Sequence, residues 1–298
     1  MNFFHKFEDP RGLGCIALES IDEGELLLSV PFNECIWPSD SHEDPFAGLL
    51  RSISTNQGDH LKNIRESGSL DHLPVMEGLQ SINLLSSLGN VFIALTSPYT
   101  DKFPRWVLAL ALSRCFDSES QNGTIAFVPY ADQFNHSTRC WNTRIRETSD
   151  GAFCFYAETR IEKNSEILNN YGIESDIEMW VTHGFVDDGL TDSVIYLPLS
   201  FLRVEDSQQD DEAEDDPLMK IDVNCDEVIP REIRNLFILD DFLPKVCDAL
   251  IRAMNRMLIS DDLVIEGVSN PIARSLIQKD RRNCAKYRQR LVEFKANL

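Results

Sequence analysis

The sequence predicts an α+β fold in which short strands enclose a helical insert and a helical carboxyl-terminal domain follows. Apolar residues form short runs or alternate over residues 15–21, 26–31 and 151–161, a pattern typical of strands. Residues 44–117 instead repeat apolar side chains at helical spacing. A run of acids at residues 205–216 separates these segments from a final part with helical periodicity alone.

The charge of the chain limits the partners that it can bind. The 298 residues include 28 Lys and Arg against 49 Asp and Glu, a formal net charge of −21. We therefore exclude nucleic acid as the main partner, because phosphate binding needs a positive field. A protein substrate with a basic target segment matches this charge better. No membrane partner is expected, because the longest apolar run, residues 106–112, is too short to cross a bilayer.

The amino end and the cysteines indicate the compartment. The first ten residues have neither the long apolar core of a signal peptide nor the acid-poor composition of a transit peptide. Eight cysteines stand singly, without a CxxC pair, so we expect neither a disulfide framework nor a metal site. These features predict a cytoplasmic protein, with entry into the nucleus left open.

The first half of the chain predicts a hairpin followed by the helical insert. The hairpin is expected over residues 15–31, with a turn at Gly24. The insert covers about residues 38–117 and includes an apolar helix at residues 102–113, with Pro104 in its first turn. Four further apolar residues stand near helical spacing: Leu79, Ile82, Leu85 and Leu88.

Strands return after the insert and lead to one well-marked helix. They are expected at residues 124–131 and 151–161. Ser175 and Glu178 have the spacing of a capping box, which opens a helix, and Gly184 is placed to end it. Tyr171 therefore lies just ahead of a helix start.

The acidic run marks a domain boundary. Residues 205–216 contain eight acids in twelve residues, which favours a solvated linker. We predict a first domain at residues 1–200, a mobile acidic linker at 201–220 and a helical domain at 221–298. Within the last domain, helices are expected at residues 230–258 and 271–298.

A glycine-rich segment near the amino end offers one alternative function. Gly12-Leu-Gly14-Cys-Ile-Ala17 fits the dinucleotide-binding fingerprint G-x-G-x-x-[GA]. That fingerprint requires a strand before it and a helix after it, whereas a second strand is expected here. We therefore favour another role for these glycines, which allow close approach of the backbone to a ligand.

Six motifs follow one another along the chain. They are Arg11-Gly-Leu-Gly14-x-Ile-Ala17, Ile21-x-x-Gly24-Glu25, Ser113-Arg114-x-Phe116, Asp132-x-x-Asn135-His136-Ser137, Asn170-Tyr171-Gly172, and Ser175-Asp-x-Glu178 running to Gly184-Phe185. In this order they resemble the SET domain of the Rubisco large-subunit lysine methyltransferase class. The resemblance covers about residues 11–186. It implies a SET fold of short β-sheets with a pseudoknot and a helical insert, followed by an all-helical domain similar to that class's substrate-binding domain.

The resemblance implies S-adenosylmethionine as the cofactor. Arg114 would pair with the cofactor carboxylate, a geometry that suits a guanidinium fork. Asn135 would bind through its side-chain amide and His136 mainly through its backbone. The implied cofactor contacts are Arg11, Gly12, Leu13, Gly14, Arg114, Asn135, His136 and Tyr171.

The resemblance also implies a catalytic residue and a substrate channel. Tyr171 matches the catalytic tyrosine of the class, where its hydroxyl orients the reacting groups. The implied channel residues are Phe116, Asp132, Phe134, His183 and Phe185.

Each of these residues has a simpler interpretation. Arg114 could be a cation that complements the end of a helix, and Phe116 or Phe185 could belong to the core. Tyr171 could be a half-buried aromatic residue ahead of a helix. His136 could be a histidine whose side chain is satisfied within the protein, which agrees with binding through its backbone.

Position 183 leaves the acceptor open. His183 stands where the Rubisco class often has a tyrosine that shapes the nitrogen channel, and Asp176 stands where it often has asparagine. We predict a protein methyltransferase with lysine as the acceptor. Histidine methylation is one alternative. The other is a SET protein without turnover that binds a partner through its helical domain.

Overall fold

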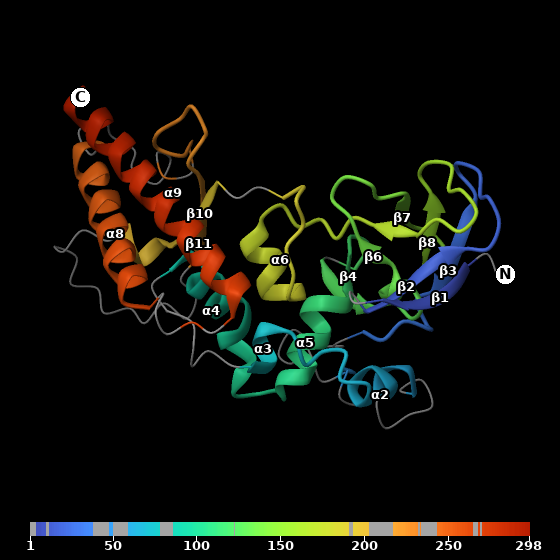
Figure 1. Cartoon of the computed structure of the whole chain (residues 1–298). Coiled ribbons are helices and arrows are strands. Elements are labelled where there is room, and N and C mark those ends of the chain that lie inside the picture. The colour runs from blue at the N-terminus through green and yellow to red at the C-terminus, as the bar shows by residue number, and fades with distance from the viewer. Residues whose placement is uncertain are drawn as a thin grey trace. The chain divides into compact units, whose positions relative to one another are not determined.

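The structure is a computed structural model of the chain. It describes residues 4–9, 12–37, 48–49, 59–77, 86–121, 123–190, 193–202, 217–231, 233, 243–264, 268 and 270–298 (Figure 1).

The chain divides into two compact units. The first unit comprises Met1–Glu77, Tyr99–Ile173 and Asp187–Leu190. The second comprises Gly78–Pro98, Glu174–Val186 and Thr191–Leu298. In the described parts of both units, no helix combines the length and the apolar character needed to cross a membrane.

Short strands build the first unit, as the sequence predicts, but the hairpin predicted over residues 15–31 is wrong. Residues 12–17 pair with residues 4–9, and residues 26–31 pair with residues 152–157. The largest sheet has three antiparallel strands, with β8 between β3 and β7. β1 and β2 form one antiparallel pair, β4 and β5 another, and β6 and β9 pair in parallel. The strands are β1 (Phe4–Asp9), β2 (Gly12–Ala17), β3 (Leu26–Pro31), β4 (Cys115–Ser118), β5 (Thr124–Phe127), β6 (Asn135–His136), β7 (Thr143–Glu147), β8 (Ala152–Ala157) and β9 (Leu168–Asn169).

The core of the first unit lies around the central strand β8. Its Phe155 is fully buried and makes edge-to-face contacts with Phe134, at 5.8 Å between ring centroids, and with Phe116, at 5.6 Å. Aromatic pairs of this geometry contribute about 0.5–1.5 kcal/mol beyond the area that they bury. An isolated antiparallel bridge between Ile21 and Ile161 extends the same core.

Helices appear within the insert, but part of the prediction falls outside the described residues. The helices are α2 (Asp59–Glu66), α3 (Pro74–Glu77), α4 (Ser87–Thr100) and α5 (Arg105–Arg114). Leu88 is buried in α4, whereas Leu79, Ile82 and Leu85 lie outside the described residues. Pro104 has ψ 141° and caps α5 instead of joining its first turn, so this helix begins later than residue 102.

The helix after the candidate tyrosine confirms the predicted capping box. α6 (Asp176–His183) begins where the Ser175 hydroxyl accepts a hydrogen bond from the backbone N–H of Glu178 at 3.2 Å. It ends at Gly184, which adopts φ 77° and donates its N–H to the Trp180 carbonyl at 2.9 Å. Glycine reaches this left-handed conformation without the steric cost of a Cβ atom.

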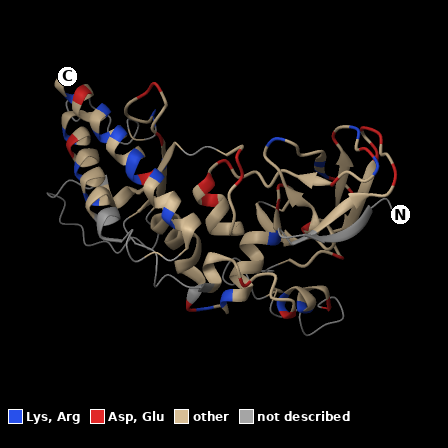
Figure 2. Ribbon diagram, in the orientation of Figure 1, with Lys and Arg blue, Asp and Glu red and all other residues tan. Residues whose placement is uncertain are grey.

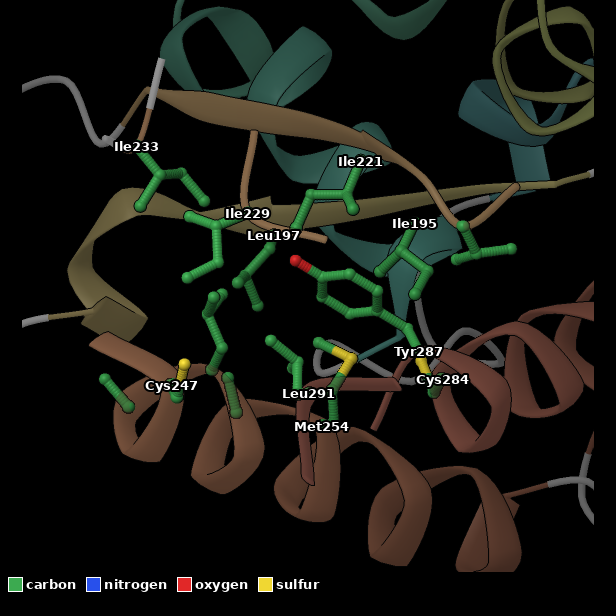
Figure 3. Packing of buried hydrophobic residues seen from close by; sticks show 14 of the residues in the cluster. Ile195, Leu197, Ile221, Ile229, Ile233, Cys247, Met254, Cys284, Tyr287 and Leu291 are labelled. Carbon is green, nitrogen blue, oxygen red and sulfur yellow. The ribbon is translucent and has the colours of Figure 1, made fainter. Parts of the chain in front are cut away.

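The second unit packs two long helices against a strand pair. α8 (Leu243–Val264) and α9 (Pro271–Ala296) lie side by side, and β10 (Val194–Pro198) pairs antiparallel with β11 (Leu218–Asp222) (Figure 1). The short 3₁₀ helix η4 (Leu199–Leu202) follows β10. Ten residues labelled in Figure 3 share the core: Ile195, Leu197, Ile221, Ile229, Ile233, Cys247, Met254, Cys284, Tyr287 and Leu291.

β11 adds a strand at the start of the predominantly helical carboxyl-terminal region. It begins at Leu218, inside the segment predicted as a linker. The alternation that marks β11 is only five residues long, and its stability comes from pairing with β10. The domain boundaries at residues 200 and 220 stay predictions.

A buried carboxylate joins two helices of the second unit. Asp280 of α9 is 1% exposed and accepts hydrogen bonds from the backbone N–H of Ser87 at 2.7 Å and from its hydroxyl at 2.6 Å. Burial raises the pKa of Asp280 to about 6, although the Ser87 hydrogen bonds oppose the shift. The folded state therefore binds a proton at Asp280 more tightly than the unfolded chain does.

We expect Asp280 to make the second unit less stable as the pH rises. Because the folded pKa lies above the usual value of 3.8, this contribution is complete below about pH 4 and is lost as the pH passes 6. A shift of this size corresponds to about 3 kcal/mol of unfolding free energy. Urea unfolding at several pH values should show this loss in the wild type, relative to Asp280→Asn. Identical pH dependence in the two proteins would contradict the expectation.

Candidate functional site

A short parallel strand pair positions the central residues of the site. β6 consists of Asn135 and His136, which pair with Leu168 and Asn169 of β9. The backbone N–H of Ser137 donates to the Asn169 carbonyl at 3.0 Å and extends this pairing. Two segments about thirty residues apart in sequence therefore lie together, and Tyr171 follows directly after β9.

The glycine-containing strand β2 joins the same region. The backbone N–H of Ala17 donates to the Ser165 carbonyl at 2.9 Å, and that of Ile167 donates to the Cys15 carbonyl at 2.8 Å. Gly14 is buried in β2. The backbones of Gly12 and Leu13 also belong to β2, whereas Arg11 lies outside the described residues. The predicted cofactor segment thus runs beside the chain that leads to β9.

Tyr171 contacts both Phe134 and His136. Its hydroxyl donates to the Phe134 carbonyl at 2.9 Å, and its backbone N–H donates to His136 Nδ1 at 3.1 Å. The rings of Tyr171 and His136 lie 4.9 Å apart. Burial raises the pKa of Tyr171 well above its usual range, although Arg114 opposes the shift. The phenol therefore stays protonated at neutral pH and cannot act there as a general base.

The side chain of His136 is fully engaged within the protein. Because Nδ1 accepts the Tyr171 N–H, we assign the ring proton to Nε2. Nε2 then faces the Thr138 hydroxyl at 2.9 Å and the Asp187 carboxylate at 3.5 Å. Burial lowers the pKa of His136, and Asp187 only partly opposes this shift. The ring is therefore neutral at pH 7 and serves to fix the backbone around Tyr171.

Asn135 presents a polar side chain beside β9. Its amide nitrogen donates to Glu166 Oε1 at 2.8 Å. Within the described part of the chain, no group donates a hydrogen bond to its amide oxygen. A carboxamide oxygen and a neighbouring carboxylate together suit an ammonium group. The residues present at this position therefore fit the amino-acid end of S-adenosylmethionine.

A buried carboxylate joins Arg114 and His60, which lie on two helices of the insert. Asp132, whose side chain is 0% exposed, accepts hydrogen bonds from Arg114 Nη1 at 3.2 Å and from His60 Nε2 at 3.1 Å. Arg114 Nη1 also donates to the Asp132 carbonyl at 3.1 Å. The pairing of Arg114 with a cofactor carboxylate stays a prediction, as does the channel role of Asp132.

Sequence reasoning missed His60. The residue lies in α2, 72 positions before Asp132, and no motif surrounds it. Its neighbours in the insert have helical periodicity, which predicts a helix but gives no reason to expect a polar contact with the site. Comparison with a resembling sequence would not single it out either, because the six motifs do not include the segment around it.

The predicted channel residues divide between the two units. Phe116 and Phe134 contact Phe155, and Phe134 is 1% exposed, so both help to form the core of the first unit. His183 and Phe185 lie in the second unit, with their ring centroids 6.2 Å apart. His183 Nδ1 is 2.7 Å from the Thr182 hydroxyl. The channel itself stays a prediction.

Comparison with known proteins agrees with this arrangement. Residues 12–172 match the SET domain family. No curated protein matches the chain. A crystal structure of the SET domain of LSMT bound to lysine and AdoHcy superposes with a TM-score of 0.60 at 15% identity, covering 99% of this chain and 87% of that one. A structure of Rubisco LSMT bound to AdoMet gives a TM-score of 0.57 at 14% identity, with the same coverage.

These comparisons confirm the fold that the motif order predicts. The two LSMT structures share the fold along nearly the whole of this chain. The family match begins at the glycine-containing strand β2 and ends at Gly172, so it includes Asn135, His136 and Tyr171. Because it spans more than half of the sequence, the chain belongs to the SET domain family, whose methyltransferases use S-adenosylmethionine as their cofactor.

Proposed function

We propose that this chain is a protein methyltransferase that transfers a methyl group from S-adenosylmethionine to a lysine side chain. The observation that carries the proposal is the parallel pair β6 and β9, which brings Asn135, His136 and Tyr171 together in a SET-family chain. The LSMT structures that share this fold were solved with lysine, methyllysine and AdoHcy. Those ligands support lysine as the acceptor.

The residues around β6 would hold the cofactor. Asn135 offers its amide oxygen to the cofactor ammonium, and Glu166 adds negative charge beside it. The strand containing Gly14 runs next to Glu166 through the bridge between Ile16 and Glu166. When bound, S-adenosylmethionine supplies a methyl group on a positively charged sulfur. The protein supplies alignment, which is the largest contribution expected for an in-line transfer.

Tyr171 would orient the reacting groups as a neutral phenol. Its proton is directed to the Phe134 carbonyl, which leaves the oxygen lone pairs as acceptors. An acceptor of this kind suits an amine N–H or the polarised hydrogens of a methyl group on a cationic sulfur. Because the raised pKa keeps this phenol protonated, the proton lost by the substrate must leave by another route.

The acceptor nitrogen must be deprotonated before it reacts. For a lysine of ordinary pKa, the free-energy cost at pH 7 is about 4.6 kcal/mol. An apolar environment and an adjacent positive charge both lower that pKa. A site that combines a neutral tyrosine, a neutral histidine and a nearby cationic cofactor therefore favours the reactive amine.

Calorimetric binding of S-adenosylmethionine tests the cofactor role of Asn135. We expect Asn135→Ala to raise the dissociation constant about tenfold or more, because a hydrogen bond to a charged group is lost. Asn142→Ala is the matched control. Asn142 also donates to Glu166, through the backbone carbonyl at 2.9 Å, but lies outside the motif. Equal weakening in both variants would mean that loosening of β6 and β9, not loss of a ligand contact, explains the result.

Labelled methyl transfer into a cell extract tests the reaction and the acceptor. We expect wild-type protein to label protein, with methyllysine recovered after hydrolysis. Recovery of methylhistidine instead would contradict lysine as the acceptor but would support the proposed methyltransferase activity. Cofactor binding without any labelling in an extract that supports a known lysine methyltransferase would favour a SET protein without turnover.

A further inference from the structure

The hairpin of α8 and α9 carries charge opposite to that of the rest of the chain. The two helices, residues 243–264 and 271–296, contain eleven Lys or Arg against five Asp or Glu, in a chain with 28 and 49 overall. Figure 2 shows Lys and Arg spread along α9. Of the five acids, Asp280 is buried and Asp248 pairs with Lys295. The two helices therefore carry a net positive charge.

Three arginines form a row along α9. Arg274, Arg281 and Arg288 are exposed and follow one another at intervals of seven residues. Seven residues make almost two helical turns, so these side chains lie on one side of the helix. The row is about 21 Å long at 1.5 Å per residue. Beside this row, α9 is buried in the core of the second unit, as Tyr287 and Leu291 illustrate.

A second row lies on α8. Arg252 and Arg256 are exposed one turn apart, and exposed Lys245 precedes them by two turns. The helices are joined along this side by a hydrogen bond from Arg288 to Asn255 at 2.6 Å. The ion pair between Lys295 and Asp248 joins them again further along. The two rows therefore flank one seam between the helices.

We infer that this arginine face, formed by Arg252, Arg256, Arg274, Arg281 and Arg288, binds an acidic polypeptide segment of a partner protein. Guanidinium groups pair with carboxylates through two parallel hydrogen bonds, which suits a row of arginines to Asp and Glu side chains. A length of about 21 Å accommodates six or seven extended residues. Such a segment carries only a few charges.

The charge of the remaining chain argues against a long polyanion. Outside the hairpin the chain is more acidic than its net charge of −21 indicates. Duplex DNA carries about one negative charge per 1.7 Å and extends far beyond a face of this length. Repulsion from the rest of the protein then opposes its binding. A short acidic segment gains the same contacts without that extended repulsion.

Fluorescence anisotropy with a short labelled polyglutamate peptide tests the inference. The measurement uses the full chain at low salt and needs no cofactor, so it is independent of the proposed methyl transfer. We expect saturable binding that weakens as salt is added. Reversing three charges of the arginine face, with Arg252→Glu, Arg281→Glu and Arg288→Glu combined, should weaken binding about tenfold or more.

A control with the same net charge separates this face from a general charge effect. Lys62, Lys102 and Lys163 are exposed in the first unit. Their combined replacement by Glu should leave the dissociation constant within about threefold of wild type, since these lysines do not belong to the arginine face and a change in net charge alone is screened by salt. Far-ultraviolet circular dichroism verifies that both triple variants are folded. The triple variant Arg252→Gln, Arg281→Gln and Arg288→Gln removes the three charges without reversing them. Its dissociation constant should lie between those of the wild type and the Arg→Glu triple.

Three outcomes overturn the inference. Equal weakening by the two Glu triples would assign binding to net charge alone. Tighter binding of duplex DNA or of phosphatidylserine vesicles, lost in the arginine-face triple, would assign the face to another class of partner. Binding of the peptide only after the acids of residues 205–216 are replaced by Gln and Asn would assign the face to this chain's own acidic run.

Discussion

Tyr171→Phe should abolish most methyl transfer while leaving the cofactor bound. We expect kcat to fall about 10²–10³-fold, the usual effect of removing one polar group that acts on the transition state. The affinity for S-adenosylmethionine should change much less, because Asn135 and the β2 backbone remain. Single-turnover labelling and calorimetry measure the two effects separately. A variant that keeps wild-type kcat would remove Tyr171 from the reaction.

The same substitution also removes a structural hydrogen bond. Loss of the hydroxyl removes the hydrogen bond that it donates to the Phe134 carbonyl, which costs about 1–3 kcal/mol of unfolding free energy. Tyr287→Phe is the matched control, because its hydroxyl donates to the Val228 carbonyl at 2.7 Å within the core of the second unit (Figure 3). This control should lose similar stability and keep kcat. If both variants lost activity equally, instability would explain the result for Tyr171.

Asp132→Ala should give the largest loss of stability in the first unit. It removes the fully buried carboxylate that Arg114 and His60 share. Breaking a buried charge pair by deleting one partner costs about 3–5 kcal/mol, because the remaining charge is left uncompensated. Urea unfolding should therefore occur at clearly lower denaturant concentration. Asp132→Asn retains one acceptor oxygen and should lose less.

Two comparisons define what the Asp132 result means. Glu162→Gln removes an exposed carboxylate that pairs with Arg160 at 2.9 Å, and its unfolding midpoint should stay within experimental error of wild type. His60→Ala should affect stability less than Asp132→Ala, because the pair of Arg114 and Asp132 survives. If Asp132→Ala unfolded like the Glu162 variant, the buried network would have no role in stability.

The sequence alone determined the features that depend on neighbouring residues. The capping box of Ser175 and Glu178 and the stop at Gly184 define α6 correctly, because caps act within one turn. The apolar run of β8 identifies a strand for a similar reason. The order of the six motifs also identified the SET fold, since each motif is a short local pattern.

Part of the site could be predicted because its residues lie inside those motifs. Asn135, His136 and Tyr171 were named from the sequence, and the structure brings them together through β6 and β9. Their individual contacts were not predictable. No sequence pattern predicts that the Tyr171 hydroxyl donates to the Phe134 carbonyl or that the Asn135 amide donates to the Glu166 carboxylate. These hydrogen bonds depend on which strands pair.

The tertiary structure decided every interaction between distant segments. It brought His60 of the insert to Asp132, and it paired β11 with β10 although the alternation of β11 is short. It also gathered the arginines of α8 and α9 on either side of one seam. The physical reason is common to all three. Local patterns record what a residue contributes to its own helix or strand, whereas a hydrogen bond or packed surface between segments exists only when the chain has folded and excluded water from between them.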